Sequence, residues 1–320
     1  MFILLLYEAS AKIRTRWVLS TDLEPTYKSK FSASRLYETK TSNKMKGSQW
    51  QIRYGSGERV TGGVYTDRVR IGGLEVPKQA VQAAVTLAGR GVAQNKYMDG
   101  ILGMGFSGLN QVRPKKVLTW FDNIRGSLEQ PLFVSNLKKN APGSFDFGFL
   151  DKKKYVGDIA WVGVNSTKGF WDFKVEGFGV GDGAIKRTNT YNIIDTGSSL
   201  WFMPEELVKD YYSKVRGAQA PPKTAGGNIP GVVAGYTFPC NATLPDITLV
   251  VGGKKVSVPG RNMNYQMQNR ALNRCFGGLQ TRASYMPFNL FGDIFLKGMY
   301  VVFEHKPGGL PRIGVARATS

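Results

Sequence analysis

The chain has 320 residues, of which 42% are hydrophobic and 21% charged, a composition typical of globular proteins with more than one domain. The 43 Lys and Arg residues outnumber 23 Asp and Glu, but the basic residues form scattered short pairs such as Lys115–Lys116. We therefore expect a solvated basic surface with no nucleic-acid partner, and no membrane span, because no apolar run approaches roughly 18–20 residues.

The first residues give an ambiguous signal for secretion. Met1 to Tyr7 is apolar, and Ala9-Ser10-Ala11 resembles a cleavage site, but no positively charged segment precedes this short apolar run. We therefore expect a poor signal peptide. Two N-x-Ser/Thr sequons, at Asn165 and Asn241, fit a secretory route.

Strand patterns dominate the first half of the chain. Trp50 to Tyr54 and Gly63 to Ile71 alternate in hydrophobicity, and Gly55-Ser56-Gly57 lies between them, so a long hairpin is predicted. A helix is predicted over Lys116 to Leu128, where apolar residues recur at helical spacing. Asp99-Gly100-Ile101-Leu102-Gly103 precedes it and ends in two apolar residues and a glycine.

The second half repeats this outline. Strands are predicted at four further places, namely Phe145–Phe149, Asp158–Val164, Ile247–Val251 and Met299–Phe303. A helix over Pro204 to Val215 begins with proline at a favourable first position. Leu290-Phe291-Gly292 matches Ile101-Leu102-Gly103 in pattern. We expect two β-rich lobes, residues 1–150 and 151–320, with few short helices.

A single aspartate gives the sharpest chemical signal. Asp195 lies in Ile193-Ile194-Asp195-Thr196-Gly197-Ser198-Ser199, between β-branched residues and a turn of small residues. A carboxylate is rarely buried unless it is hydrogen-bonded, and Thr196, the Gly197 backbone and Ser198 could supply donors. The alternative is an ordinary Asx-type turn leading into the next helix. His305 is the single histidine, and the residues after it indicate a surface turn, so nothing marks it for a Ser-His-Asp or Cys-His device. A zinc site built on several histidines or cysteines is not expected either.

The two cysteines, Cys240 and Cys275, leave two alternatives open. In a reducing compartment they would be thiols, whereas in a secreted protein they would form one bridge closing a loop of about 35 residues.

The Asp195 motif resembles the second active-site motif of pepsin-like aspartic proteases, peptidase family A1. Tyr54-Gly55-Ser56-Gly57 resembles the flap of that family, and Trp17 matches the tryptophan that follows the first active-site motif. Asp99 to Gly103 and Phe291-Gly292-Asp293 resemble the paired loop motifs of the two lobes. The similarity extends over nearly the whole chain and is closest to fungal secreted members.

The resemblance implies an all-β bilobal fold and hydrolysis of peptide bonds by two aspartates that share a proton and activate a water. It implies that Asp195 is catalytic, that Trp17 and Thr196 support the site, and that Cys240 and Cys275 form a disulfide. It assigns substrate binding to five residues, Tyr54, Gly55, Ser56, Gly197 and Ser198. It further implies peptide or protein substrates, a secreted monomer, and neither cofactor nor metal.

The resemblance fails at the first aspartate. Counting back from Trp17, the position falls on Ser10, and the expected Asp-Thr-Gly-Ser is replaced by Ser10-Ala11-Lys12-Ile13. Two explanations compete. Either residues 1 to about 16 replace the true start of the sequence, which we favour because the match breaks abruptly, or the chain is a catalytically inactive, protease-like peptide-binding protein.

Overall fold

The computed structural model describes residues 3–7, 19–20, 36–37, 39–54, 57–88, 98–222 and 234–319. These residues form two compact units. The first unit comprises Met1–Leu128 and Ser166–Phe170, and the second comprises Glu129–Asn165 and Trp171–Ser320. The boundary of the two lobes at residues 150 and 151 stays a prediction.

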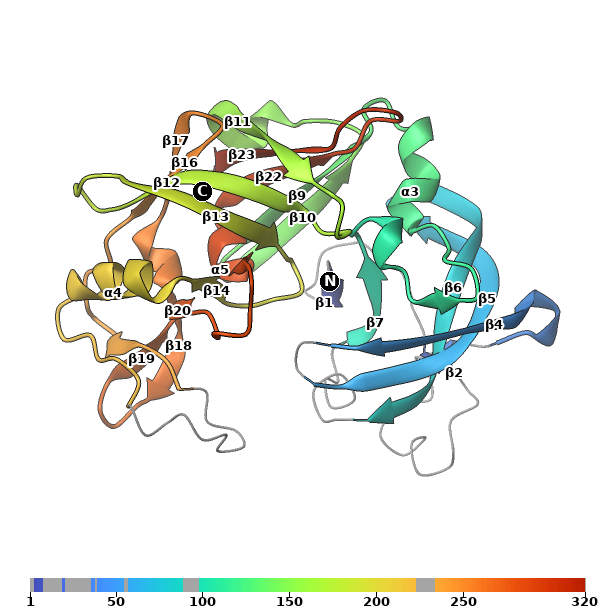
Figure 1. Ribbon diagram of the computed structural model, residues 1–320, viewed down its shortest axis with the longest axis horizontal. Helices are drawn as coiled ribbons and strands as arrows, with labels where there is room; N and C mark the ends of the chain where they lie inside the picture. The colour runs from blue at the N-terminus through green and yellow to red at the C-terminus, as the bar shows by residue number, and fades with distance from the viewer. Residues whose placement is uncertain are drawn as a thin grey trace. The chain divides into compact units, whose positions relative to one another are not determined.

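The first unit is built mainly of strands (Figure 1). Its strands are β1 Ile3–Tyr7, β2 Leu19–Ser20, β3 Leu36–Tyr37, β4 Lys44–Arg53, β5 Arg59–Ile71, β6 Leu74–Ala88, β7 Met98–Gly103 and β8 Val112–Arg113. Its helices are α3 Trp120–Ile124 and the short 3-10 helices η2 Thr41–Asn43, η3 Ser107–Leu109 and η4 Arg125–Ser127.

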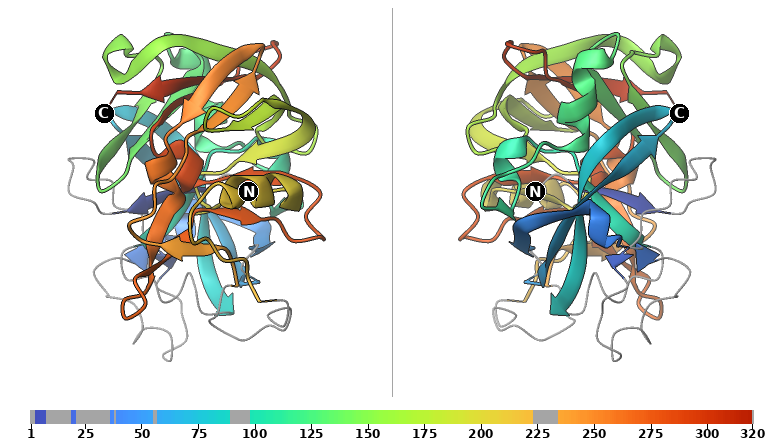
Figure 2. Two further views of the ribbon diagram at one scale, coloured as in Figure 1. Left: turned by 90° about the vertical axis from the view of Figure 1, so that its left-hand side faces the viewer. Right: turned by 90° about the vertical axis from the view of Figure 1, so that its right-hand side faces the viewer.

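Four of these strands form one antiparallel sheet in the order β6-β5-β4-β8. The β5–β6 hairpin turns at Gly72 and Gly73, whose φ angles of 53° and 88° suit a two-residue turn that ordinary side chains disfavour. The sheet carries a core cluster of six buried residues, Trp50, Val60, Val64, Ala84, Leu87 and Val112. The blue and cyan ribbons in the side views of Figure 2 show these long strands.

The helix predicted over Lys116 to Leu128 is shorter in the structure. The α-helix α3 begins at Trp120 because the Thr119 side chain accepts a hydrogen bond from the Asp122 amide and caps it. It ends at Ile124 and continues as the 3-10 helix η4. The prediction was therefore right in kind and wrong in its bounds.

Among the described residues, the second unit contains more strands than the first. They are β9 Leu132–Lys138, β10 Ala141–Phe147, β11 Tyr155–Asn165, β12 Asp172–Val180, β13 Lys186–Ile194, β14 Trp201–Met203, β15 Thr237–Pro239, β16 Ile247–Val251, β17 Lys254–Val258, β18 Asn264–Asn269, β19 Arg274–Gly277, β20 Leu279–Thr281, β21 Asn289–Phe291, β22 Met299–Glu304 and β23 Arg312–Ala318. Its helices are η5 Lys152–Lys154, α4 Glu205–Ser213, η7 Gly260–Met263 and α5 Asp293–Leu296.

The main sheet of the second unit runs in the order β10-β9-β22-β23-β11-β12-β13-β21-β14-β20, with β16 and β17 attached through β12. Most neighbours are antiparallel, but β13 pairs with β21 in parallel, and so does β14 with β20. Large aromatic side chains fill the space beside these strands, and Trp201, Phe291 and Phe295 contact one another. These aromatic side chains belong to or contact β14 and β21, one strand from each parallel pair.

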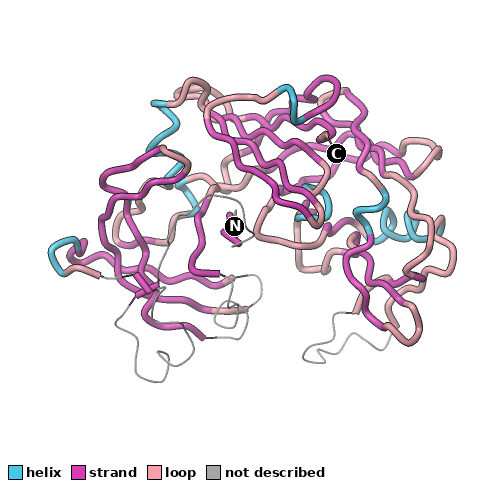
Figure 3. The backbone as a smooth tube through the Cα atoms, turned by 180° about the vertical axis from the view of Figure 1, so that it is seen from behind, coloured by secondary structure: helices cyan, strands magenta, loops and turns pink. Residues whose placement is uncertain are grey.

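The all-β fold class is confirmed. Strands make up most of the tube in Figure 3, and helices appear as short turns between them. Within the described ranges, no helix has the length and apolar character needed to cross a membrane.

Candidate active site

Asp195 follows the last residue of strand β13 directly. Ile193 and Ile194 are buried, and they pair with Leu290 and Phe291 of β21 in parallel register. β-Branched residues suit such a doubly covered strand, and the strand fixes the backbone from which the aspartate leaves. Asp195 itself is 6% exposed. The Asp195 carboxylate therefore lies at the end of a buried strand, where it needs hydrogen-bond donors because burial of an unpaired charge is costly.

The turn after the strand supplies that environment. One carboxylate oxygen, Oδ1, accepts a hydrogen bond from the Gly197 amide at 3.0 Å, and the other, Oδ2, accepts one from the Ser198 hydroxyl at 2.8 Å. The Ser198 amide also donates to the Asp195 carbonyl at 3.2 Å, which closes the turn. Both oxygens are therefore held, and the plane of the carboxylate is fixed. The Asx-type turn is present and positions the acid at the same time.

A second loop lies against this turn. The Asp195 amide donates to the Phe291 carbonyl at 3.1 Å, and the Asp293 amide donates to the Ser198 carbonyl at 2.8 Å. Between these contacts is Gly292, where an added Cβ would lie 2.3 Å from the Ser198 carbonyl oxygen. No side chain fits there. The two loops thus hold each other in place by backbone contacts, and this glycine permits their approach.

Asp293 is the main feature of this site that sequence analysis did not assign. Burial raises the pKa of its carboxyl, Lys297 opposes the rise through an ion pair at 3.1 Å, and the charge of Asp195 adds to it. Its Oδ1 atom is buried and has no hydrogen-bond partner among the described residues. The repeated apolar-apolar-glycine pattern pointed to the loop, but not to a second acid beside Asp195.

Tyr54 lies at the tip of the β4–β5 hairpin in the first unit. The Tyr54 amide donates to the Glu58 carbonyl, and the Gly57 amide donates to the Tyr54 carbonyl, both at 2.9 Å. The half-buried ring packs against the core cluster of the sheet. Burial, with the Glu58 charge, raises its pKa to about 12, so the hydroxyl is neutral at any acidic or neutral pH. Tyr54 is therefore anchored as a neutral aromatic group.

Four of the predicted site residues lie outside the described residues. They are Ser10, Trp17, Gly55 and Ser56. Their roles stay predictions.

The cysteines of the second unit form a disulfide. Cys240 and Cys275 are joined with their Cα atoms 4.9 Å apart, and the bond links the end of β15 to strand β19. Thr196, the remaining predicted support residue, is buried next to Asp195.

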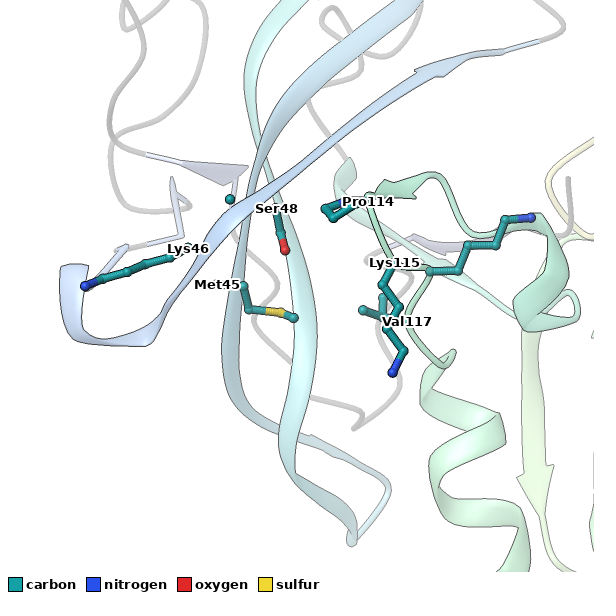
Figure 4. Close-up of a pocket in the computed structure, with 8 residues that line it drawn as sticks. Met45, Lys46, Ser48, Pro114, Lys115 and Val117 are labelled. Atoms are coloured by element: carbon teal, nitrogen blue, oxygen red, sulfur yellow. The ribbon is translucent and has the colours of Figure 1, made fainter.

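A pocket of about 370 Å³ in the first unit offers different chemistry. It is lined by eight residues, Met45, Lys46, Gly47, Ser48, Pro114, Lys115, Lys116 and Val117. Figure 4 shows Lys46 on the opposite side of the β4 ribbon from Pro114 and Val117. No carboxylate lines this pocket, so it cannot supply the acids for hydrolysis. In the part of the chain that is described, no group of three or more His, Cys, Asp or Glu residues is arranged to hold a metal ion.

Comparison with known proteins decides the family. The model of the family described as eukaryotic aspartyl protease matches residues 14–318. The chain belongs to this family. It is 40% identical over 301 residues to aspergillopepsin-1 of Aspergillus clavatus, which covers 94% of this chain and 72% of that protein. It is also 40% identical over 304 residues to penicillopepsin-2 of Penicillium janthinellum, with the same coverage of 94% and 72%.

A solved structure supports the fold of this aspartyl protease family member. The aspartic proteinase from Irpex lacteus superposes with a TM-score of 0.70 over 90% of this chain and 86% of that chain, at 20% sequence identity. At this identity the likeness concerns the fold alone. The family assignment rests on the sequence matches, and the range matched by the family model begins at residue 14, just after Ser10 to Ile13. The relatives are aspartic endopeptidases, and the pepsin-like family predicted from the motifs is confirmed.

Proposed function

We propose that Asp195 is a catalytic acid of an aspartic endopeptidase, and that full activity needs a second carboxylate at the sequence position that Ser10 occupies in this chain. The observation that supports this most directly is the buried Asp195 carboxylate, held by the Gly197 amide and the Ser198 hydroxyl, in a chain of the aspartyl protease family. Family membership gives peptide-bond hydrolysis as the reaction class. The residue roles are our assignment.

The two donors to Asp195 define what the acid can do. They hold both oxygens, so the carboxylate keeps one orientation toward a bound water molecule. It can accept the proton of that water when the water attacks a peptide carbonyl. A single carboxylate cannot at the same moment be ionised to activate the water and protonated to support the carbonyl oxygen. A pair of acids that shares one proton fills both roles, because two like charges close together do not ionise equally.

The other residues are assigned to substrate positioning. Gly197 and Ser198 would offer backbone and hydroxyl contacts to the peptide, and Thr196 would support the turn. Tyr54, with Gly55 and Ser56, would cover the bound peptide and exclude water; the anchored ring of Tyr54 supports this. Trp17 would support the first acid position. None of these roles requires a cofactor.

The setting we propose is extracellular, with peptide or protein substrates and a monomeric enzyme. The disulfide between Cys240 and Cys275 supports an oxidising compartment. The solvated basic surface is compatible with this setting and supplies no specific partner.

The test uses a restored chain, in which residues 1–13 are replaced by a strand that ends in Phe-Asp-Thr-Gly-Ser. This chain should cleave denatured globin at acid pH. Asp195→Asn in the restored chain should reduce the rate by at least roughly 10²–10⁴-fold, whereas Asp182→Asn, at an exposed aspartate of the same unit, should leave it unchanged.

Binding separates catalysis from peptide recognition. A peptide whose scissile amide is replaced by a hydroxyethylene group mimics the tetrahedral intermediate and should bind the restored chain tightly. Tight binding of unmodified peptides without any cleavage would identify a peptide-binding protein instead. Cleavage that persists after Asp195→Asn would disprove the assignment of Asp195.

A further inference from the structure

We propose that Asn241 carries an N-linked glycan that covers the exposed turn beside the disulfide. Asn241, Ala242 and Thr243 form an N-x-Thr sequon directly after Cys240. The structure places Asn241 and Thr243 at the surface, in a turn closed by a 2.8 Å hydrogen bond from the Ala242 amide to the Pro239 carbonyl. A glycan on this residue therefore meets no packing obstacle in the folded chain.

The modification is a transfer of an oligosaccharide from a lipid-linked diphosphate donor. The amide nitrogen Nδ2 of Asn241 forms a bond to the anomeric carbon of the first sugar, and the bond from that carbon to the diphosphate oxygen breaks. The amide gives up one proton and the lipid diphosphate leaves. No oxidant or reductant takes part. The transfer takes place in the secretory route, so this inference rests on the extracellular setting proposed above.

The surroundings of Asn241 indicate what the glycan does there. The amide of the preceding Cys240 donates to the Asn273 carbonyl at 3.0 Å, and Leu272 is the next residue back along that turn. Leu272 is 69% exposed. This hydrogen bond therefore joins the residue before Asn241 to the residue after Leu272. A bulky, hydrophilic glycan at Asn241 would cover this exposed apolar side chain.

The second sequon provides an internal comparison. Asn165 is also exposed, but it is the last residue of strand β11, where it pairs with Asp172 of β12. The exposed hydrophobic residues of these neighbouring strands, Val156 in β11 and Tyr191 in β13, lie in a sheet and not in a turn. Asn165 thus lies at a strand end and not in the turn after the disulfide, and Asn165→Gln is the matched control for Asn241→Gln.

The modification is tested with the full chain placed behind a heterologous secretion leader, so that entry into the secretory route does not depend on the chain's own start. The secreted protein is deglycosylated in O-18 water, and the peptide that contains residue 241 is analysed by mass spectrometry. We expect O-18-labelled aspartate at position 241. The label should disappear with Asn241→Gln and with Thr243→Ala, persist with Thr243→Ser, and be unaffected by Asn165→Gln.

An unmodified Asn241 in the secreted parent protein would overturn the proposal. A separate expression of the chain without the added leader reports on the proposed extracellular setting, so the two can fail independently.

The covering role has its own measurement. Asn241→Gln should increase self-association, followed by light scattering of the purified protein, and Asn165→Gln should not. Adding Leu272→Ser to Asn241→Gln should remove the increase. Equal scattering by Asn241→Gln and by the double variant Asn241→Gln, Leu272→Ser would refute the covering role. The proposed modification of Asn241 would still stand.

Discussion

Each unit contains a strand with two apolar residues that are followed by a glycine, but the two strands pair in different directions. In the second unit, β21 pairs in parallel with β13, so both chains leave the sheet at the same end and Asp195 lies beside Gly292. In the first unit, β7 pairs antiparallel with β1, with Ile3 opposite Gly103 and Tyr7 opposite Met98. The same sequence pattern therefore has a parallel neighbour in one unit and an antiparallel neighbour in the other.

Strand direction explains why this difference matters. β1 ends opposite Met98, at the end of β7 away from Gly103. The two ends of β7 are separated by about 16 Å at the usual rise per residue. In the second unit the corresponding separation does not exist, because the strands are parallel. An acid at the position of Ser10 needs a reversed neighbouring strand as well as the right side chain.

The largest effect we expect tests this point directly. The unmodified chain and its Ser10→Asp variant should both hydrolyse globin at a rate near background, because the Asp lacks the parallel strand and the Gly-Ser turn. The restored chain, with a new strand before Asp-Thr-Gly-Ser, should exceed both by at least roughly 10²–10⁴-fold, the contribution of one general acid–base group. Rates are compared at equal concentrations of folded protein.

Two outcomes would break the comparison. If Ser10→Asp alone reached the rate of the restored chain, the strand direction would be irrelevant. If the unmodified chain cleaved globin and Asp195→Asn stopped the cleavage, the assignment of the first acid to the position of Ser10 would be wrong.

The second effect concerns stability, because the disulfide holds the second unit and not the first. Replacing Cys240 and Cys275 by alanine opens a loop with a sequence separation of 35. The lost restraint on the unfolded chain is worth about 3–4 kcal/mol in the chain-entropy treatment. Urea denaturation, followed by hydrogen exchange of peptides from each unit, should show the loss in the second unit. An equal loss in peptides from residues 57–88 would contradict it.

The sequence predicted the fold better than it predicted the site. Ile247–Val251 forms a strand with the predicted bounds, because its alternate side chains are buried on one face. Asp195 and its donors were also recognisable, since they lie within four consecutive residues. The acid Asp293 was not, because it approaches Asp195 only through the parallel pairing of β13 and β21, which are distant in sequence. Local patterns do not show that pairing.

A smaller effect tests the close approach of the two loops in the second unit. Gly292→Ala would place a Cβ 2.3 Å and 2.4 Å from the carbonyl oxygens of Ser198 and Leu200. The backbone must shift, which typically costs about 1–3 kcal/mol, and activity of the restored chain should fall with it. Gly163→Ala, where no atom lies within 4 Å of the added Cβ, is the control. An equal loss in Gly103→Ala would show a similar approach in the first unit and weaken the comparison.

The smallest effect concerns the residue after each glycine, which is Asp293 in the second unit and the buried Met104 in the first. Burial raises the pKa of Asp293, so this carboxyl binds more protons in the folded chain than in the unfolded chain. Its contribution to stability is therefore largest at low pH and declines as pH rises from about 3.9, the unfolded value, through the folded value.

Asp293→Asn removes this titration, although it also removes the ion pair with Lys297. The free energy of unfolding of Asp293→Asn minus that of the parent should accordingly increase with pH across that window, in urea denaturation at a series of pH values. Asp182→Asn, at an exposed position, should give a flat difference. A flat difference for Asp293→Asn would contradict the raised pKa. A falling difference would mean that the carboxyl beside Asp195 is stabilised in its charged form, and the second unit would then tolerate two acids where the first carries a methionine.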